Sequence, residues 1–153
     1  LGWRSWLMGY KNIFLPSSIV YHDSGTSTII LGSGKVKHLA RYHGSKNYIL
    51  THLKNLEFEN LVKILPIHVG LWFGLAVYSL VRKGSFEEFM WIVKGIWWNV
   101  VHLRKNLYKR AQIQGKRKVS DKKLFAIWMQ KKSIWYFIGK VVNTHKVGNA
   151  QSF

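Results

Sequence analysis

Apolar residues recur at intervals of three and four along much of this chain, a spacing that is typical of one face of an α-helix. The clearest example is an apolar stripe in the second half of the chain, formed by Phe89, Ile92, Val93, Ile96, Trp97, Val100, Leu103 and Leu107. Trp and Lys mix on the opposite side, which favours a helix in the plane of a membrane surface, or else one packed on a soluble core. On this pattern we expect helices at about residues 36–60, 61–82, 86–110 and 121–140.

The first 34 residues have a different pattern. Trp3, Trp6 and Tyr10 predict a short amphipathic helix that ends near Gly9. Residues 12–15 and 18–22 read as two short strands on either side of a Pro-Ser turn, and residues 23–34 as a loop rich in Gly, Ser and Thr. The pattern therefore predicts a mostly α fold with a small β element.

The most apolar run extends from Ile64 to Val81, with Lys63 before it and Arg82-Lys83 after it. A spanning helix needs about 20 apolar residues, so this run is marginal. A single span would place one of two basic flanks outside the cytoplasm, against the usual preference. We expect either a hairpin of residues 61–83 and 86–103 that re-enters the cytosol, or two helices in the cytoplasmic interface. Gly70 and Gly74 have a spacing that can bring helices close together.

Charge narrows the class of partner. The chain has 24 Lys+Arg against 6 Asp+Glu, a formal net charge of +18. Such an excess requires an anionic partner: nucleic acid, anionic lipid or a phosphorylated substrate. The chain is also 48% hydrophobic with 8 Trp, and amphipathic rings together with cations suit a membrane–water interface. There is no Cys, which excludes disulfides and thiolate metal sites.

The residues alone form no complete catalytic site. We expect Glu87 and Glu88 to open a helix and to interact with its dipole. Glu57 and Glu59 precede the apolar run and are expected to be solvated. The histidines show no helical pair beside an acid, so a hydrolytic metal site built from this chain alone is not expected.

Several segments, taken in order, resemble family-2 glycosyltransferases of the rhamnosyltransferase-like type. The first is Trp3-Arg4-Ser5-Trp6, followed by Gly9-Tyr10 and by Val20-Tyr21-His22 ahead of the Gly/Ser-rich loop. The second contains Arg41, Lys46-Asn47 and the ending Leu53-Lys54-Asn55. The basic connector of residues 109–121 is similar to the tails of membrane-associated members.

The resemblance implies three parts. Residues 1–60 would be the carboxy-terminal part of a GT-A catalytic domain, itself an α/β fold. Residues 61–110 would be membrane-associated hydrophobic and amphipathic helices, and residues 111–153 a basic connector and a carboxy-terminal amphipathic helix. The parent would transfer a sugar, with inversion, from a nucleotide sugar to a lipid-linked or cell-surface glycan. It would act in cell wall or polysaccharide biosynthesis at the cytoplasmic face of the cell membrane.

The resemblance also implies site residues. His22 would complete the coordination of a divalent metal, Mg or Mn, and the metal would stabilise the negative charge of the departing diphosphate. The loop residues Ser24, Gly25, Thr26 and Ser27 would close over phosphate oxygens. Donor or acceptor phosphate would also meet Arg4, Arg41, Lys46 and Asn47, and Trp3 would pack near the acceptor. Lys46 stands where the family has Arg and lacks the bidentate fork, a role that Arg41 could take over.

The family's nucleotide-binding half, its Asp-x-Asp motif and its acidic base precede the Trp-Arg segment and are not in this sequence. The base is expected just before Leu1, so the chain alone is expected to be inactive. The expected partners are a nucleotide sugar, a glycan or polyprenyl-linked acceptor and an anionic membrane surface. One alternative is a non-enzymatic cationic membrane protein. A nucleic-acid binder is disfavoured, because it would have to bury the apolar run, and nucleic acid is not an expected partner.

Overall fold

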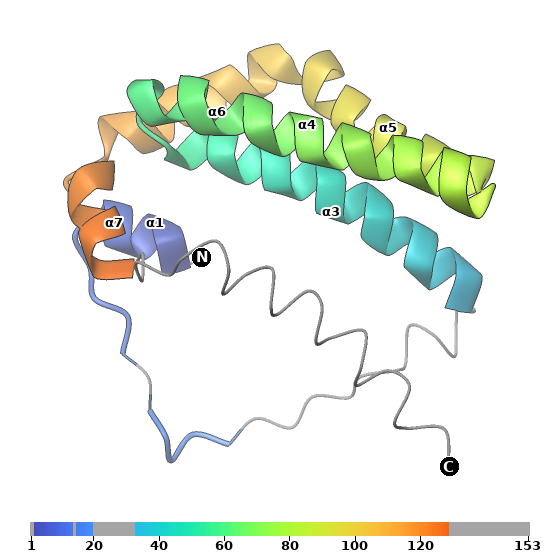
Figure 1. Cartoon of the computed structure of the whole chain (residues 1–153). Coiled ribbons are helices and arrows are strands. Elements are labelled where there is room, and N and C mark those ends of the chain that lie inside the picture. The colour runs from blue at the N-terminus through green and yellow to red at the C-terminus, as the bar shows by residue number, and fades with distance from the viewer. Residues whose placement is uncertain (1, 14, 20–32, 129–153) are drawn as a thin grey trace. The chain divides into compact units, whose positions relative to one another are not determined.

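The computed structural model describes residues 2–13, 15–19 and 33–128 (Figure 1). Its helices are α1 (Gly2–Leu7), α3 (Ser33–Asn55), α4 (Phe58–Lys83), α5 (Phe86–Val101), α6 (Leu103–Gly115) and α7 (Asp121–Trp128). The chain forms two compact units, Leu1–Asp121 and Lys122–Phe153. The first unit contains α1 to α6 and all the sites described below.

The described residues are 81% helical and contain no strand, so the predicted β element and the α/β GT-A portion are wrong for them. Residues 12–13 and 15–19 are neither helix nor strand, and residues 20–22 lie outside the described part. Ile13, Leu15 and Ile19 are largely exposed. The segment therefore lacks the packed neighbour that a short strand requires.

The helices that the periodicity predicts are present with shifted bounds. The expected helix at 86–110 is two helices, α5 and α6, which meet at His102. The His102 backbone there has φ −100° and ψ 18°, outside the helical range. The helix expected at 121–140 is described only as far as Trp128.

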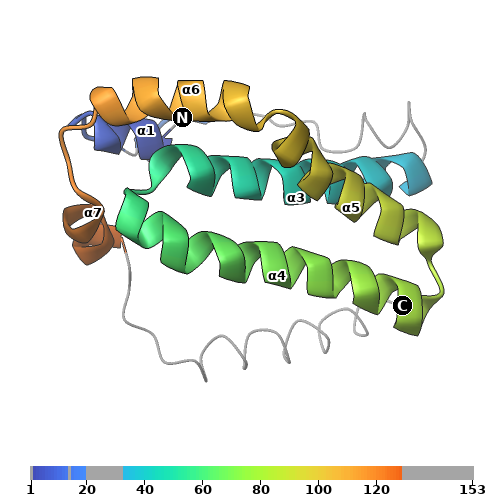
Figure 2. The same ribbon diagram turned by 90° about the horizontal axis from the view of Figure 1, so that it is seen from above.

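Helices α3, α4 and α5 pack against one another in pairs, and α6 lies along the carboxy-terminal half of α3 (Figure 2). Tyr48 and His52 of α3 meet His68 of α4, and Gly44 lies against Trp72, so α3 and α4 run antiparallel. Helix α3 therefore sits against both α4 and α5, and it positions most of the polar groups described below.

The closest approach of two helices in the unit is between Ser45 of α3 and Gly95 of α5. Ser45 is fully buried, and its Oγ lies 3.2 Å from the carbonyl oxygen of Ile92. A Cβ added at Gly95 would lie 2.0 Å from Ser45 Oγ and 2.6 Å from the Tyr42 carbonyl oxygen. No side chain fits there. At Gly70 and Gly74, by contrast, an added Cβ meets nothing within 4 Å among the described residues, so the close approach that their spacing allows is not found there.

The side chains of α6 and the following connector satisfy the last carbonyls of α3. Arg110 Nη1 donates to the carbonyl oxygens of Leu53 and Leu56, at 2.6 and 2.7 Å. Gln114 Nε2 donates to the Lys54 carbonyl at 2.9 Å, and Arg117 donates to that of Asn55. A helix end leaves four carbonyls without intrahelical partners, so these donors replace solvent at that end.

The start of α4 is held by reciprocal hydrogen bonds between Glu57 and Asp121. The Asp121 carboxylate accepts from the Glu57 amide at 2.7 Å and from Asn60 Nδ2 at 3.1 Å. In return, the Glu57 carboxylate accepts from the Asp121 amide at 3.0 Å. Arg117 Nη1 pairs with both carboxylates, 2.9 Å from Asp121 and 3.3 Å from Glu57. The expectation that Glu57 is merely solvated is therefore wrong.

We call the five residues Glu57, Arg110, Gln114, Arg117 and Asp121 the polar junction. It fixes the turn between α3 and α4 from the side of α6.

We predict that Gly95→Ala destabilises the fold by about 1–3 kcal/mol, because the added methyl group must displace backbone of α3. Gly74→Ala is the matched control. It should be neutral or up to about 1 kcal/mol stabilising, since Ala is the better helix former and space is open. Chemical unfolding in detergent, followed by circular dichroism, measures both. Equal stability of the two variants would show that α3 and α5 do not approach as described.

Candidate functional site

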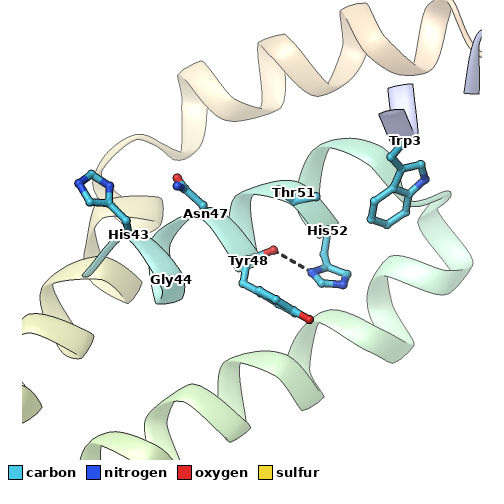
Figure 3. A pocket seen from close by; sticks show the side chains of 7 residues that line it. All are labelled: Trp3, His43, Gly44, Asn47, Tyr48, Thr51 and His52. Atoms are coloured by element: carbon cyan, nitrogen blue, oxygen red, sulfur yellow. Dashed lines mark hydrogen bonds between the residues drawn. The ribbon is translucent and has the colours of Figure 1, made fainter. Parts of the chain in front are cut away.

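A pocket of about 590 Å³ opens beside one face of α3, close to α1 (Figure 3). Six of its lining residues come from successive turns of α3, at spacings of one, three and four that place them on the same side of the helix. The seventh, a Trp, comes from α1. The lining residues are Trp3, His43, Gly44, Asn47, Tyr48, Thr51 and His52. We call this the aromatic pocket.

Aromatic and imidazole rings hold one end of the aromatic pocket in place. Trp3 meets His52 edge-on with ring centroids 6.0 Å apart, and His52 stacks on His68 of α4 at 4.3 Å. His52 Nδ1 lies 2.7 Å from the Tyr48 carbonyl oxygen (Figure 3). Because a carbonyl can only accept, Nδ1 carries the proton, and Nε2 of the neutral ring is left as an acceptor.

A second pocket, of about 350 Å³, adjoins the first through Tyr48. It is lined by Tyr48, His68, Leu71, Trp72 and Leu75. Its residues from α4 are apolar except for His68, so we call it the apolar pocket. Together the two pockets have one end beside α1 that is lined by rings and polar side chains, and another end along α4 that is mainly apolar.

His68 of the apolar pocket stacks on His52 of the aromatic pocket, and the charge of His52 affects the pKa of His68. Burial lowers the pKa of the His68 imidazole below its ordinary value, and the nearby His52 lowers it further. A lowered pKa favours the neutral ring, so His68 is uncharged over more of the physiological range than an ordinary histidine.

We predict that His52→Ala raises the pKa of His68 toward its ordinary value, because the change removes both a neighbouring imidazole and part of the cover over the ring. His43→Ala is the control, since His43 lines the aromatic pocket but is not among the groups that shift His68. Titration of the imidazole protons by NMR gives the pKa in each variant. An unchanged value in His52→Ala would contradict the stacking of these two rings.

The predicted phosphate-binding residues are distributed over three places. Asn47 lines the aromatic pocket together with the predicted acceptor residue Trp3. Arg4 lies beside the end of α3, where its Nε donates to Asn55 Oδ1 at 3.4 Å. Lys46 places its ammonium 5.0 Å from the ring centroids of Tyr42 and Trp98, a cation–π arrangement on the side of α5.

Arg41 is engaged in an ion pair. Its Nε donates to Glu88 Oε1 at 2.7 Å, and Lys83 Nζ lies 3.5 Å from the other oxygen. Burial alone would raise the pKa of Glu88. The hydrogen bond and charge of Arg41, with Lys83 and Lys37, instead hold it below its usual value. Arg41 therefore keeps a buried carboxylate ionised between α3 and α5, a contact that the sequence did not indicate.

The predicted metal ligand His22 and the predicted phosphate loop, Ser24, Gly25, Thr26 and Ser27, lie outside the described residues. Within residues 2–13, 15–19 and 33–128, no three His, Asp or Glu side chains gather as a metal site. The metal site that the resemblance implies stays a prediction.

Sequence reasoning missed several residues of these pockets. Tyr48 lies in the segment that resembles the family but was given no role, and His52 and His68 belong to no motif, although the helical spacing of His52 with Tyr48 is visible in the sequence. A third pocket, of about 250 Å³, is lined by Arg4, Lys54, Lys109, Gln112 and Ile113. Its cations come from α1, α3 and α6, so only the fold brings them together.

No family model, curated protein or solved structure matches this chain.

Proposed function

We propose that the chain is the acceptor-side, membrane-attached part of a glycosyltransferase. The reaction moves a sugar, with inversion, from a nucleotide sugar to a lipid-linked or cell-surface glycan. The proposal assigns the nucleotide-binding half and the acidic base to sequence that precedes Leu1. It assigns a divalent metal to His22 together with residues of that half.

The observation that carries the proposal is the meeting of two motif segments that are far apart in the sequence. The Trp-Arg pair of α1 lies against the last two turns of α3, which end in Leu53-Lys54-Asn55. Trp3 contacts the His52 ring, and Arg4 donates to Asn55 Oδ1. Both segments resemble the same family. Trp3 of the first segment and Asn47 of the second line the aromatic pocket, and Arg4 and Lys54 line the third pocket together.

The aromatic pocket suits a saccharide. The faces of sugar rings carry C–H groups that pack on aromatic rings, and hydroxyls need hydrogen-bond partners at the edges. Trp3 and Tyr48 supply rings, while Asn47 and Thr51 supply polar groups. The adjoining apolar pocket along α4 fits the first isoprene units of a polyprenyl carrier.

Helix α4 supplies the membrane attachment. It has 26 residues and is, by length and composition, apolar enough to cross a membrane; only 11% of its most apolar stretch is buried. The large exposed side chains on it are Phe58, Val62, Ile67, Leu71, Phe73, Val77, Tyr78, Leu80 and Val81. Leaving so many apolar groups in water is unfavourable, whereas an acyl interior accepts them.

The packing of α4 favours attachment in the plane of the membrane over a span. Helix α3 runs antiparallel beside α4 and carries Lys37, Arg41, Lys46 and Lys54. A spanning α4 would draw α3 into the hydrocarbon, at about 2.5–3.5 kcal/mol for each central charge. Helix α5 has 16 residues, below the roughly 17 needed to cross back. We therefore propose that α4 lies on the cytoplasmic face of the cell membrane and that the basic residues meet anionic lipid headgroups.

The test uses the longer parent chain, with the donor half restored, in membrane vesicles. We predict transfer of label from a nucleotide sugar to a polyprenyl-linked saccharide. Trp3→Ala should lower kcat/KM for the acceptor about tenfold, the effect of losing about 1.4 kcal/mol of stabilisation. Tyr10→Ala is the matched control, since Tyr10 is an exposed ring outside the aromatic pocket.

Absence of transfer with every nucleotide sugar tried would overturn the enzymatic proposal. The non-enzymatic cationic membrane protein would then be the better account. Equal activity of Trp3→Ala and Tyr10→Ala would remove the aromatic pocket from the acceptor site.

A further inference from the structure

Three cations from three helices line one small pocket, which we call the cationic pocket. Arg4 of α1, Lys54 of α3 and Lys109 of α6 line it, with Gln112 as a further polar group. Lys105, one turn before Lys109, acts electrostatically on Lys54 as well. The pocket has a volume of about 250 Å³, which accommodates a phosphate or diphosphate but not a whole sugar nucleotide.

Among the described residues, no acid forms an ion pair with the cations of this pocket. The ion pairs of the described residues involve His38, Arg41, Lys83 and Arg117. In that part of the chain none of them involves Arg4, Lys54, Lys105 or Lys109. Like charges held together repel one another, so this arrangement is costly without a bound anion.

The repulsion is least screened by water at Lys54, because this residue is only 6% exposed. Burial lowers the pKa of its ammonium group, and the positive charges of Lys109, Arg4 and Lys105 lower it further. Its backbone is also fixed, since its carbonyl accepts from Gln114 Nε2. A buried lysine beside exposed Arg4, Lys105 and Lys109 produces a local positive potential that attracts an anion.

A hydrogen bond to Asn55 holds the Arg4 guanidinium group beside the cationic pocket. Its Nε bond to Asn55 Oδ1 sets the plane of the guanidinium group. The two terminal nitrogens of such a group are the pair that binds phosphate oxygens side by side.

We propose that Arg4, Lys54 and Lys109, supported by Lys105, form a binding site for a phosphate or diphosphate group. The biological source of that group rests on the proposed function: a nucleotide diphosphate, or the phosphate that joins a polyprenyl carrier to its glycan. The site itself is a property of these side chains and needs no transfer reaction.

The first experiment is calorimetric titration of the 153-residue chain, in neutral detergent, with pyrophosphate and with uridine diphosphate. We expect binding that weakens as salt is added. Lys54→Gln combined with Lys109→Gln should lower the affinity about tenfold or more, because two charge-assisted contacts are lost. Lys11→Gln combined with Lys63→Gln removes the same charge at exposed positions and should leave the affinity within about twofold.

Two further variants keep the test decisive if the change at buried Lys54 impairs folding. Lys109→Gln alters only an exposed residue and should still weaken binding. Arg4→Lys keeps the charge but removes the fork, so it should weaken binding while the helical circular dichroism stays unchanged.

The second experiment distinguishes the sources. Flotation compares vesicles containing a polyprenyl phosphate with vesicles containing phosphatidylglycerol at equal surface charge. A preference for the polyprenyl phosphate that is lost in Lys109→Gln assigns the site to the carrier lipid. Tight binding of uridine diphosphate without such a preference assigns it to the nucleotide.

The inference is overturned if the unsubstituted 153-residue chain binds none of these probes, or if the pocket variants bind them as tightly as the Lys11 and Lys63 control. Failure of transfer in the longer chain, with phosphate binding intact, would instead count against the proposed function alone.

Discussion

The turn between α3 and α4 depends on one guanidinium group held between two carboxylates. Arg117 pairs with Asp121 and Glu57 and also donates to the end of α3. The Asp121 side chain is fully buried, so removing Arg117 would leave an uncompensated buried charge, at about 3–5 kcal/mol. The polar junction thereby holds the end of α3, the start of α4 and the connector together, so it fixes the direction in which α4 leaves α3.

This constraint shapes the surface at the carboxy-terminal end and along the middle of α3. Near its end, the junction brings α6 against α3, which places Lys109 beside Lys54 and Arg4 and forms the cationic pocket. Along its middle, α4 is directed back over α3, which brings the rings of Tyr48, His52 and His68 together and leaves the far side of α4 exposed. A single arrangement thus presents apolar groups on α4, cations at α6 and a ring-lined pocket beside α1.

The sequence predicts the helices well because their positions depend on a local periodicity, which the chain carries plainly. It misleads at residues 12–13 and 15–19, where the apolar side chains of Ile13, Leu15 and Ile19 look like strand positions but are largely exposed. It also cannot show which glycine is in a close contact. Gly70 and Gly74 carry the familiar spacing and lie in open space, whereas Gly95 has no motif and lies against Ser45.

The candidate site was predictable only in part, for the same physical reason. The motif residues Trp3 and Asn47 were found by resemblance, and the structure places them on one pocket. The sequence did not indicate that Lys54 is buried beside Lys109, or that Glu57 pairs with Asp121. Both arrangements arise from packing between distant segments, which no local pattern encodes.

The central claim, that the folded unit attaches to the membrane through α4 lying in its plane, can be measured directly by spin-label depth. The chain has no Cys, so single labels can be placed at Val62, Phe73 and Leu80, which are all exposed and share one side of α4. In vesicles, the accessibility of each label to oxygen is compared with its accessibility to a nickel chelate, and the ratio gives the depth of the label. We predict the same shallow depth at all three positions. A deep Phe73 with Val62 and Leu80 at opposite interfaces would show that α4 spans the membrane and would contradict the account.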